Sequence, residues 1–250
     1  MWAKNTHFAN TSTRDTLRIG STVIPPLASF LISDIAQFSW PSKYSNYALV
    51  VADPPWPNLS ASRANAYNTL DPYYLFSIDL KHHLVPGALV AVWVTHKLKY
   101  KQFVTDKLFP AWGVQFAAEW TWLKVTTHGD LMFDKKLANR RPYEILLIGR
   151  RAGHSDTSQL ALPREMLFAS VPSSHHSQKP FLDSLLEPYL PKPESPQPSL
   201  PKHFLISKLE LFARMTRTGW HSWGNECLKF NHLSCLEERI FESKNQQNKV

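Results

Sequence analysis

The run Ala48-Leu49-Val50-Val51-Ala52 is apolar at every position, and Leu89-Val90-Ala91-Val92-Trp93-Val94 repeats this character. A strand with one wet face alternates apolar and polar residues, whereas a strand of a parallel sheet that is covered on both faces does not. These two runs therefore predict central strands of a sheet with helices on both sides. Six short apolar runs stand out, and most of them have strand character: Tyr47–Ala52, Ala88–Val94, Val114–Lys124, Tyr143–Gly149, Met166–Val171 and Phe204–Ala213.

Segments with helical spacing lie between these runs. Asp71-Pro72 offers an N-cap and a first-turn proline for a helix that reaches about Leu84. The segment from Lys97 to Leu108 repeats apolar residues at helical spacing. A third helix begins at Pro180, and its apolar stripe should lie on the sheet. The stripe comprises Phe181, Leu182, Leu185, Leu186 and Tyr189. Strands that alternate with helices predict an α/β fold with a mostly parallel, doubly wound sheet.

Composition limits the classes of protein to consider. The 250 residues suffice for one large domain or two small ones, and 43% hydrophobic residues exclude a disordered chain. The formal net charge of +8 suits a polyanionic partner without proving one. No apolar run is long enough to span a membrane, and the glycines fit neither G-x-G-x-x-G nor a P-loop. Cys227 and Cys235 lack the spacing of a zinc site, so we expect no metal and a reducing compartment.

The first clear strand runs directly into Asp53-Pro54-Pro55-Trp56. This position is the carboxyl end of a strand, where ligands bind in open α/β sheets. Each proline fixes its own φ and pushes the preceding residue toward extended geometry. Because neither proline donates a hydrogen bond, the Asp53 carboxylate and the Pro54 carbonyl form an acceptor-rich site that complements an amino group with two N–H donors. Trp56 offers a flat face on which the ring that carries this amine could stack.

The chemistry suited to such a site is methylation of an amine. The amino nitrogen of adenine or cytosine is a weak nucleophile, because its lone pair is delocalised into the ring. Two acceptors that draw on its hydrogens localise the lone pair, and a methyl electrophile held close to the nitrogen supplies proximity. The structural alternative for the same four residues is a tight turn with a tryptophan in the core.

The tetrapeptide Asp53-Pro54-Pro55-Trp56 resembles the catalytic motif of the adenosine N6-methyltransferase catalytic-subunit family, and its surroundings are most similar to the methyltransferase-like protein 4 subgroup. The resemblance covers about Ser33 to His232. Further matches follow in the family's order: Arg63-Ala64-Asn65-Ala66-Tyr67, Trp93-Val94-Thr95, Glu119-Trp120-Thr121-Trp122-Leu123-Lys124, Tyr143-Glu144, His176-Ser177-Gln178-Lys179-Pro180, Leu209-Glu210-Leu211-Phe212-Ala213-Arg214 and Gly219-Trp220-His221-Ser222-Trp223-Gly224-Asn225-Glu226. The resemblance implies a Rossmann-like sheet with a circularly permuted order of motifs, and S-adenosylmethionine as cofactor.

The resemblance also implies roles for individual residues. Asp53, Pro54, Pro55 and Trp56 would be catalytic and would bind the target adenine and the methyl-donor end of the cofactor. The implied cofactor-binding residues are Asp34, Ile35, Asp53, Lys179, Glu210, Phe212, Arg214, Asn225 and Glu226. Lys179 would pair with the methionine carboxylate, a suitable role for a compact ammonium. The expected substrate readers, besides Trp56, lie in a polar loop that follows it: Arg63, Asn65 and Tyr67.

Three functions are compatible with these residues. The first is S-adenosylmethionine-dependent methylation of the N6 amino group of adenine in nucleic acid, either RNA such as small nuclear RNA or DNA. The second is a catalytically silent, nucleic-acid-binding partner subunit of a methyltransferase heterodimer. The third is methylation of a small-molecule or protein amine. We expect a nuclear protein, with the cytoplasm as the alternative. We also expect a protein partner or a further segment to strengthen nucleic-acid binding, because the N-terminal extension is short for this subgroup.

The chain divides into an N-terminal extension (1–32), a methyltransferase domain (33–232) and a flexible tail (233–250). Within the domain, residues 191–202 are a proline-rich insertion, which predicts a surface loop because prolines interrupt both helices and central strands. Relatives usually carry histidine where this chain has Gln178 before Lys179. Glutamine hydrogen-bonds but has no stacking ring, so we expect a different cofactor affinity.

Overall fold

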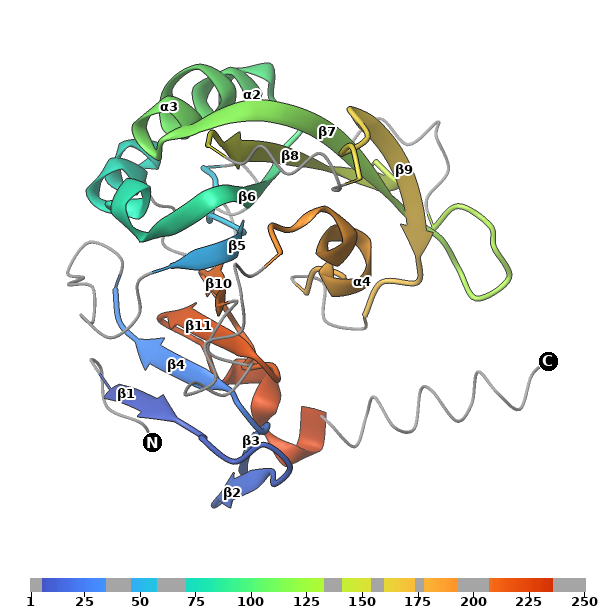
Figure 1. Ribbon diagram of the computed structural model, residues 1–250. Helices are drawn as coiled ribbons and strands as arrows, with labels where there is room; N and C mark the ends of the chain where they lie inside the picture. The colour runs from blue at the N-terminus through green and yellow to red at the C-terminus, as the bar shows by residue number, and fades with distance from the viewer. Residues whose placement is uncertain are drawn as a thin grey trace.

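One sheet of nine strands runs through the part of the chain that the structure describes (Figure 1). The structure is a computed structural model, and it describes residues 6–34, 46–57, 71–132, 141–153, 160–173, 178–192 and 207–235. In spatial order the strands are β1 (Thr6–Ala9), β4 (Ser29–Ile32), β11 (Trp220–Gly224), β10 (Ser207–Leu211), β5 (Tyr47–Ala52), β6 (Leu84–Val94), β8 (Tyr143–Arg151), β7 (Val114–Lys124) and β9 (Glu165–Ser170). A second, antiparallel sheet pairs β2 (Leu17–Ile19) with β3 (Thr22–Ile24).

The large sheet is mixed and mostly parallel. The neighbours from β4 through β11, β10 and β5 to β6 are parallel, as are β7 and β9. The pairs β1–β4, β6–β8 and β7–β8 are antiparallel. The six predicted runs overlap β5, β6, β7, β8, β9 and β10 in turn, with residues 204–206 of the last run outside the described residues. The predicted α/β class is confirmed.

The order of strands in the sheet differs from their order in the chain. The C-terminal strands β10 and β11 are inserted between β4 and β5, as a circularly permuted sheet requires. In this register Leu211 of β10 lies opposite Ala52 of β5. Because the two strands are parallel, Phe212 and Asp53 leave the sheet at the same edge.

Helical segments cover both faces of the sheet, as predicted. On one face lie α2 (Leu98–Phe103), the π-helical turn η4 (Val104–Leu108) and α3 (Phe109–Ala111); on the other lie α4 (Asp183–Leu186) and η5 (Glu187–Tyr189) (Figure 1). Alternate residues of β5 divide between the two cores. Val50 and Ala52 pack with the α2 side, whereas Leu49 and Val51 pack with the α4 side. Burial on both faces explains why β5 has no polar position.

Two predicted helices differ from the structure. Asp71 does cap the first, accepting the Tyr73 N–H, but two 3₁₀ helices, η2 (Pro72–Ser77) and η3 (Leu80–His83), replace one helix to Leu84. The buried residues Leu75, Ile78 and Leu80 explain this. Leu75 and Ile78 are three residues apart, which suits a 3₁₀ turn. Ile78 and Leu80 are two residues apart, so both can face the core only because Ile78 is extended.

The helix predicted from Pro180 is shorter than expected. It comprises α4 and η5, and Pro188 in η5 cannot donate a helical hydrogen bond. Leu182 and Leu186 of the predicted stripe are buried on the sheet. Phe181 is not: its side chain is 52% exposed and its ring lies over the Arg217 guanidinium.

The N-terminal residues belong to the main sheet. β1 and β4 lie within the predicted extension 1–32, and β4 pairs in parallel with β11. β1 and β4 are therefore strands of the main sheet, because β4 pairs with β11 and β1 pairs with β4. The proline-rich stretch from 193 and the tail from 236 lie outside the described residues. Within the described part, no helix has the length and apolar character needed to cross a bilayer.

Candidate active site

The candidate site lies where neighbouring parallel strands end. β5 is buried at every position, and Asp53 is the first residue to leave it. The Asp53 backbone N–H donates to the Leu211 carbonyl at 3.5 Å, which ties the start of the motif to the end of β10. The Asp53 side chain is 31% exposed and faces a cleft. The fold therefore aims this carboxylate out of the sheet edge, as the sequence predicts.

A tight turn shapes the motif that follows. The Trp56 N–H donates to the Pro54 carbonyl at 2.8 Å, closing a three-residue turn about Pro55. This bond uses one of the two lone pairs of that carbonyl, and the second lone pair can accept another hydrogen. The turn thus fixes the direction of the carbonyl of Pro54, the buried residue that follows Asp53, without exhausting its capacity to accept.

The prediction that Trp56 offers an open face to a substrate ring is wrong. Its side chain is only 6% exposed, and its Nε1 donates to the Trp93 carbonyl at 2.8 Å. Its ring packs against Tyr100 at 4.9 Å and meets the edge of Phe103 at 6.3 Å, centroid to centroid. A buried indole with a paired N–H gains hydrophobic area and loses no hydrogen bond. Trp56 therefore anchors the turn on α2, which is the structural alternative for this residue.

A chain of alternating charges begins at Asp53. The Lys179 Nζ lies 3.0 Å from Asp53 Oδ2 and 3.1 Å from Glu144 Oε2. Glu144, at the start of β8, also pairs with Lys124 at the end of β7. The Lys179 ammonium further lies 5.9 Å from the centre of the Trp93 ring. Lys179 therefore holds the Asp53 carboxylate directly, and Glu144 and Lys124 extend the chain of ion pairs behind it.

These ion pairs fix the charges of their members. Burial raises the pKa of Glu144, but Lys179 and Lys124 outweigh it and hold this pKa below its ordinary value. Burial lowers the pKa of Lys179, but the Asp53 and Glu144 carboxylates outweigh it and hold this pKa above its ordinary value. Lys179 therefore stays an ammonium at neutral pH, and Glu144 stays a carboxylate.

A narrow cleft opens beside Asp53 and Lys179, with a free volume of about 40 Å³. Its other walls include Gln178, Glu210 and Phe212. The Gln178 Oε1 is buried without a hydrogen-bond partner in the part of the chain that the structure describes. An unpaired buried acceptor that lines a cleft is costly, and a ligand with an N–H or O–H donor would satisfy it.

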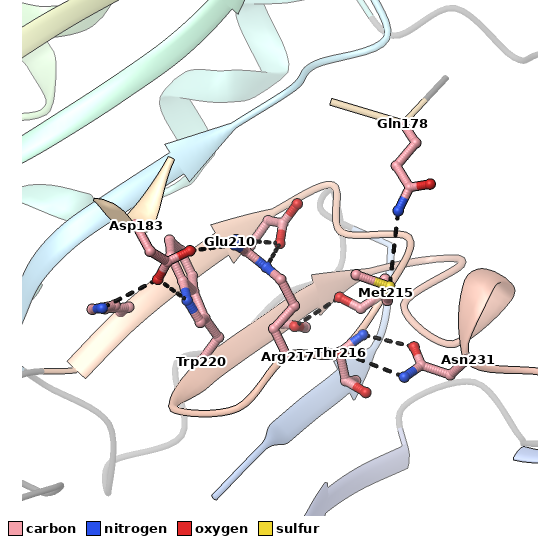
Figure 2. A network of polar contacts seen from close by, with 10 residues as sticks. Gln178, Asp183, Glu210, Met215, Thr216, Arg217, Trp220 and Asn231 are labelled. Atoms are coloured by element: carbon pink, nitrogen blue, oxygen red, sulfur yellow. Dashed lines mark hydrogen bonds and ion pairs between the residues drawn. The ribbon is translucent and has the colours of Figure 1, made fainter. Parts of the chain in front are cut away.

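The Glu210 carboxylate is held in this cleft by Arg217 (Figure 2). Arg217 donates to Glu210 Oε2 from Nε at 3.2 Å and from Nη2 at 2.9 Å, and to Asp183 Oδ2 from Nη1 at 2.8 Å. Its guanidinium also stacks 3.8 Å from the centre of the Trp220 ring. Burial raises the pKa of Glu210 above its ordinary value even though Arg217 lowers it. The network orients one carboxylate oxygen and leaves the other outside these bonds.

The remaining predicted cofactor residues are less closely gathered. Arg214 lines the cleft, and its Nε lies 3.7 Å from Glu226 Oε2. Asn225 and Glu226 are exposed in the turn after β11, and Asp34 follows β4. These three residues do not line the narrow cleft. Four predicted residues lie outside the described part of the chain: Ile35, Arg63, Asn65 and Tyr67.

Sequence reasoning gave no role to several residues of the site. Glu144 and Lys124 belong to family-like motifs, but the pairing of Glu144 with both Lys179 and Lys124 depends on strand order and is not visible in the sequence. Arg217 and Asp183 lie 34 residues apart, and no sequence pattern links them. Within the described ranges, no group of three or more metal-ligating side chains is present.

A family model described as MT-A70 matches residues 47–226, from β5 through the turn after β11. The chain belongs to the MT-A70 family. The match contains the Asp53–Trp56 motif, the Glu144–Lys179 pair and the Glu210–Arg217 pair. The comparison therefore confirms the predicted family and the methyltransferase fold.

Named relatives agree with this assignment. The N(6)-adenine-specific methyltransferase METTL4 of Homo sapiens is 36% identical over 219 residues, which cover 84% of this chain and 44% of that protein. The N6-methyladenosine RNA methyltransferase MTA1 of Cryphonectria parasitica is 39% identical, covering 74% of this chain and 52% of that protein. The DNA N6-methyl methyltransferase of Caenorhabditis elegans is 32% identical, covering 81% and 52%. This MT-A70 chain spans about half the length of the curated relatives it matches.

Proposed function

We propose that this chain is an S-adenosylmethionine-dependent methyltransferase that methylates the N6 amino group of adenine in RNA or DNA. The observation that carries the proposal is that the two consecutive residues after β5 each present an acceptor of fixed direction. The Asp53 carboxylate is fixed by Lys179 at 3.0 Å, and the Pro54 carbonyl is fixed by the turn to Trp56. Relatives named as adenine N6-methyltransferases of RNA and of DNA support the same chemistry.

The acceptors would act on the amino group itself. Asp53 has one oxygen outside its contact with Lys179, and the Pro54 carbonyl has one lone pair outside the turn. Together they can accept both hydrogens of an exocyclic amine, so that the nitrogen lone pair is localised. They are also suited to the positive charge that develops on the nitrogen as it gains a carbon. This role does not require a stacked Trp56.

The donor set beside Asp53 fits S-adenosylmethionine, which when bound supplies an electrophilic methyl group. Lys179 uses two of its three N–H donors on Asp53 and Glu144, and the third can pair with a carboxylate. The Glu210 oxygen outside the Arg217 bonds can accept from a hydroxyl, and Gln178 Oε1 can accept from an amine. Ligand sites usually measure about 300–1,000 Å³. The cleft of about 40 Å³ must therefore widen on binding.

The test is transfer of a tritiated methyl group to matched single-stranded RNA and DNA, followed by digestion to nucleosides. We expect the label in N6-methyladenosine or its deoxy form, and none in oligonucleotides without adenine. Asp53→Asn should lower the rate by about 100-fold or more, the effect of losing a group that stabilises developing charge. Asp79→Asn, at an exposed aspartate whose side chain contacts His82, is the matched control. Label in another nucleoside, or an active Asp53→Asn variant, would refute the proposal.

A further inference from the structure

A second and larger hollow lies outside the catalytic cleft, directly after the Asp53–Trp56 motif. Its free volume is about 880 Å³, within the range of about 300–1,000 Å³ usual for ligand sites. Its walls include Pro57, Tyr73, Lys99, Tyr100, Phe103 and Lys107. Tyr100 Oη donates to the Pro57 carbonyl at 2.9 Å, and the Tyr100 ring packs on Trp56. The floor of the hollow is therefore built against the catalytic motif.

An aromatic ring stands open on one wall. The Tyr73 side chain is 58% exposed, although its ring is held edge-on against Phe103 at 5.5 Å. A rigid ring with a free face is the usual platform for a base, because every base has a face that can stack. The next residue, Tyr74, is 52% exposed but is not among the residues that line the hollow. Only one of these two tyrosines is in place to serve it.

Ammonium groups accompany the rings. Lys107 Nζ lies 5.6 Å from the centre of the Tyr73 ring and donates to its hydroxyl at 3.3 Å. Lys99 Nζ lies 4.9 Å from the centre of the Tyr100 ring. Both lysines are well placed to meet a phosphate beside a stacked base.

Two carboxylates also line the hollow, and both bind within their own segments. Asp71 accepts the Tyr73 N–H at 3.0 Å, and Asp106 accepts the Thr105 hydroxyl at 2.7 Å. They cap and brace the walls. Their donors are neutral, so the two aspartates and the two lysines of the lining balance in formal charge. Within the described residues neither Lys99 nor Lys107 has a carboxylate at hydrogen-bond distance, so each ammonium can still pair with a phosphate.

We propose that this hollow, here called the flanking-nucleotide hollow, binds a nucleotide of single-stranded RNA or DNA next to the target adenine. The proposal rests on the proposed function and extends it beyond the reacting base. A base stacks on Tyr73, and its phosphate contacts Lys107 or Lys99. An apolar protein surface would fit the rings but would strip water from both ammonium groups without replacing it, which is costly. Nucleic acid satisfies rings and ammonium groups together.

The test measures the affinity of the full chain for a fluorescent single-stranded 12-mer with one adenine, by anisotropy without cofactor. Tyr73→Ala should raise Kd by about fivefold or more, the effect of losing one stacked base. The matched control Tyr74→Ala should leave Kd within about twofold. Lys107→Gln should lower the slope of log Kd against log salt by about 0.7, the contribution of one phosphate contact on a single strand. Lys81→Gln, at an exposed lysine outside the hollow, should leave the slope unchanged.

The outcomes separate this proposal from the proposed function. Equal Kd for wild type and Tyr73→Ala, with normal methyl transfer, overturns the flanking-nucleotide hollow and leaves the function standing. A wild type that neither binds nor methylates the 12-mer overturns both. A third outcome is that Tyr73→Ala binds the oligonucleotide normally and yet fails to form a complex with another protein that the wild type forms in light scattering. That result assigns the hollow to a protein partner instead. If Tyr73→Ala unfolds, the exposed Lys107 carries the test, since its truncation removes no core contact.

Discussion

Replacing Arg217 by methionine should destabilise the fold by leaving a carboxylate without its partner. Arg217 is 11% exposed and supplies both of the hydrogen bonds that Glu210 Oε2 receives in the site, at 2.9 and 3.2 Å. Asp183 would keep its bonds from Lys208 and Trp220, so the loss falls mainly on Glu210. Removing one member of a buried pair costs about 3–5 kcal/mol. Because the Glu210 side chain is 26% exposed, we expect the lower end, about 3 kcal/mol.

The assay is urea unfolding of the full chain followed by circular dichroism. In a thermal scan followed in the same way, a loss of about 3 kcal/mol corresponds to a fall in Tm of roughly 6–12 °C for a chain of this size. Arg14→Met, at an exposed arginine of the N-terminal region, is the matched control and should change nothing measurable. The double variant Arg217→Met with Glu210→Gln should recover part of the loss, because no charge is then stranded.

The pH dependence distinguishes a stranded charge from lost packing. Burial already raises the pKa of Glu210, and without Arg217 this pKa rises further. A carboxyl group with a raised pKa in the folded state binds a proton there before it does in the unfolded chain. The free energy of unfolding therefore increases as pH falls through that pKa. The deficit of Arg217→Met should shrink between pH 7 and pH 5; a deficit of constant size, or one below about 0.5 kcal/mol, would refute the reasoning.

Two further predictions concern buried rings. Trp56→Phe should lower the free energy of unfolding by about 1–3 kcal/mol, because the Trp93 carbonyl loses its donor, while oligonucleotide affinity stays within about twofold; a much weaker affinity at unchanged stability would restore the stacking role. Burial lowers the pKa of His221 to about 3, so the folded chain resists a proton that the unfolded chain accepts near pH 6.5. Acidification from pH 8 to pH 5 should therefore cost about 2 kcal/mol of stability, and His221→Asn should flatten this limb in urea titrations. A wild-type curve without that loss would contradict the buried, neutral imidazole.

The strands and the catalytic motif could be predicted because their signals are local. β5 and β6 are continuously apolar since helices cover both faces, and the Asp53 carboxylate follows β5 at the edge where ligands bind. Family resemblance added Lys179 to the site, and the structure does bring its ammonium to 3.0 Å from the Asp53 carboxylate. Each of these inferences depends on residues that are continuous in the sequence, either one strand or one motif.

The errors arose where distant segments decide. Trp56 is buried because Tyr100 and Phe103 of α2 pack on its ring, and nothing near Trp56 in the sequence places α2 there. Glu144 joins Lys179 because β8 lies beside β6 in the sheet, an order that the chain does not reveal. The 3₁₀ helices after Asp71 follow from which apolar side chains reach the core. The elements packed against this segment decide which of its apolar side chains are buried, and its capping residues do not.

The charges of the catalytic centre have a consequence for how nucleic acid binds. Asp53, Lys179, Glu144 and Lys124 alternate in sign and cancel, and Arg217 and Lys208 likewise face Glu210 and Asp183. The centre therefore presents no net positive field to a phosphate backbone. The formal net charge of +8 must be carried by residues outside it. Attraction and positioning of a polyanion are then separate from catalysis, because lysines that met phosphates at the reacting amine would compete for the carboxylates that activate it. Lys99 and Lys107 lie beyond the motif, where they can hold a strand without disturbing Asp53.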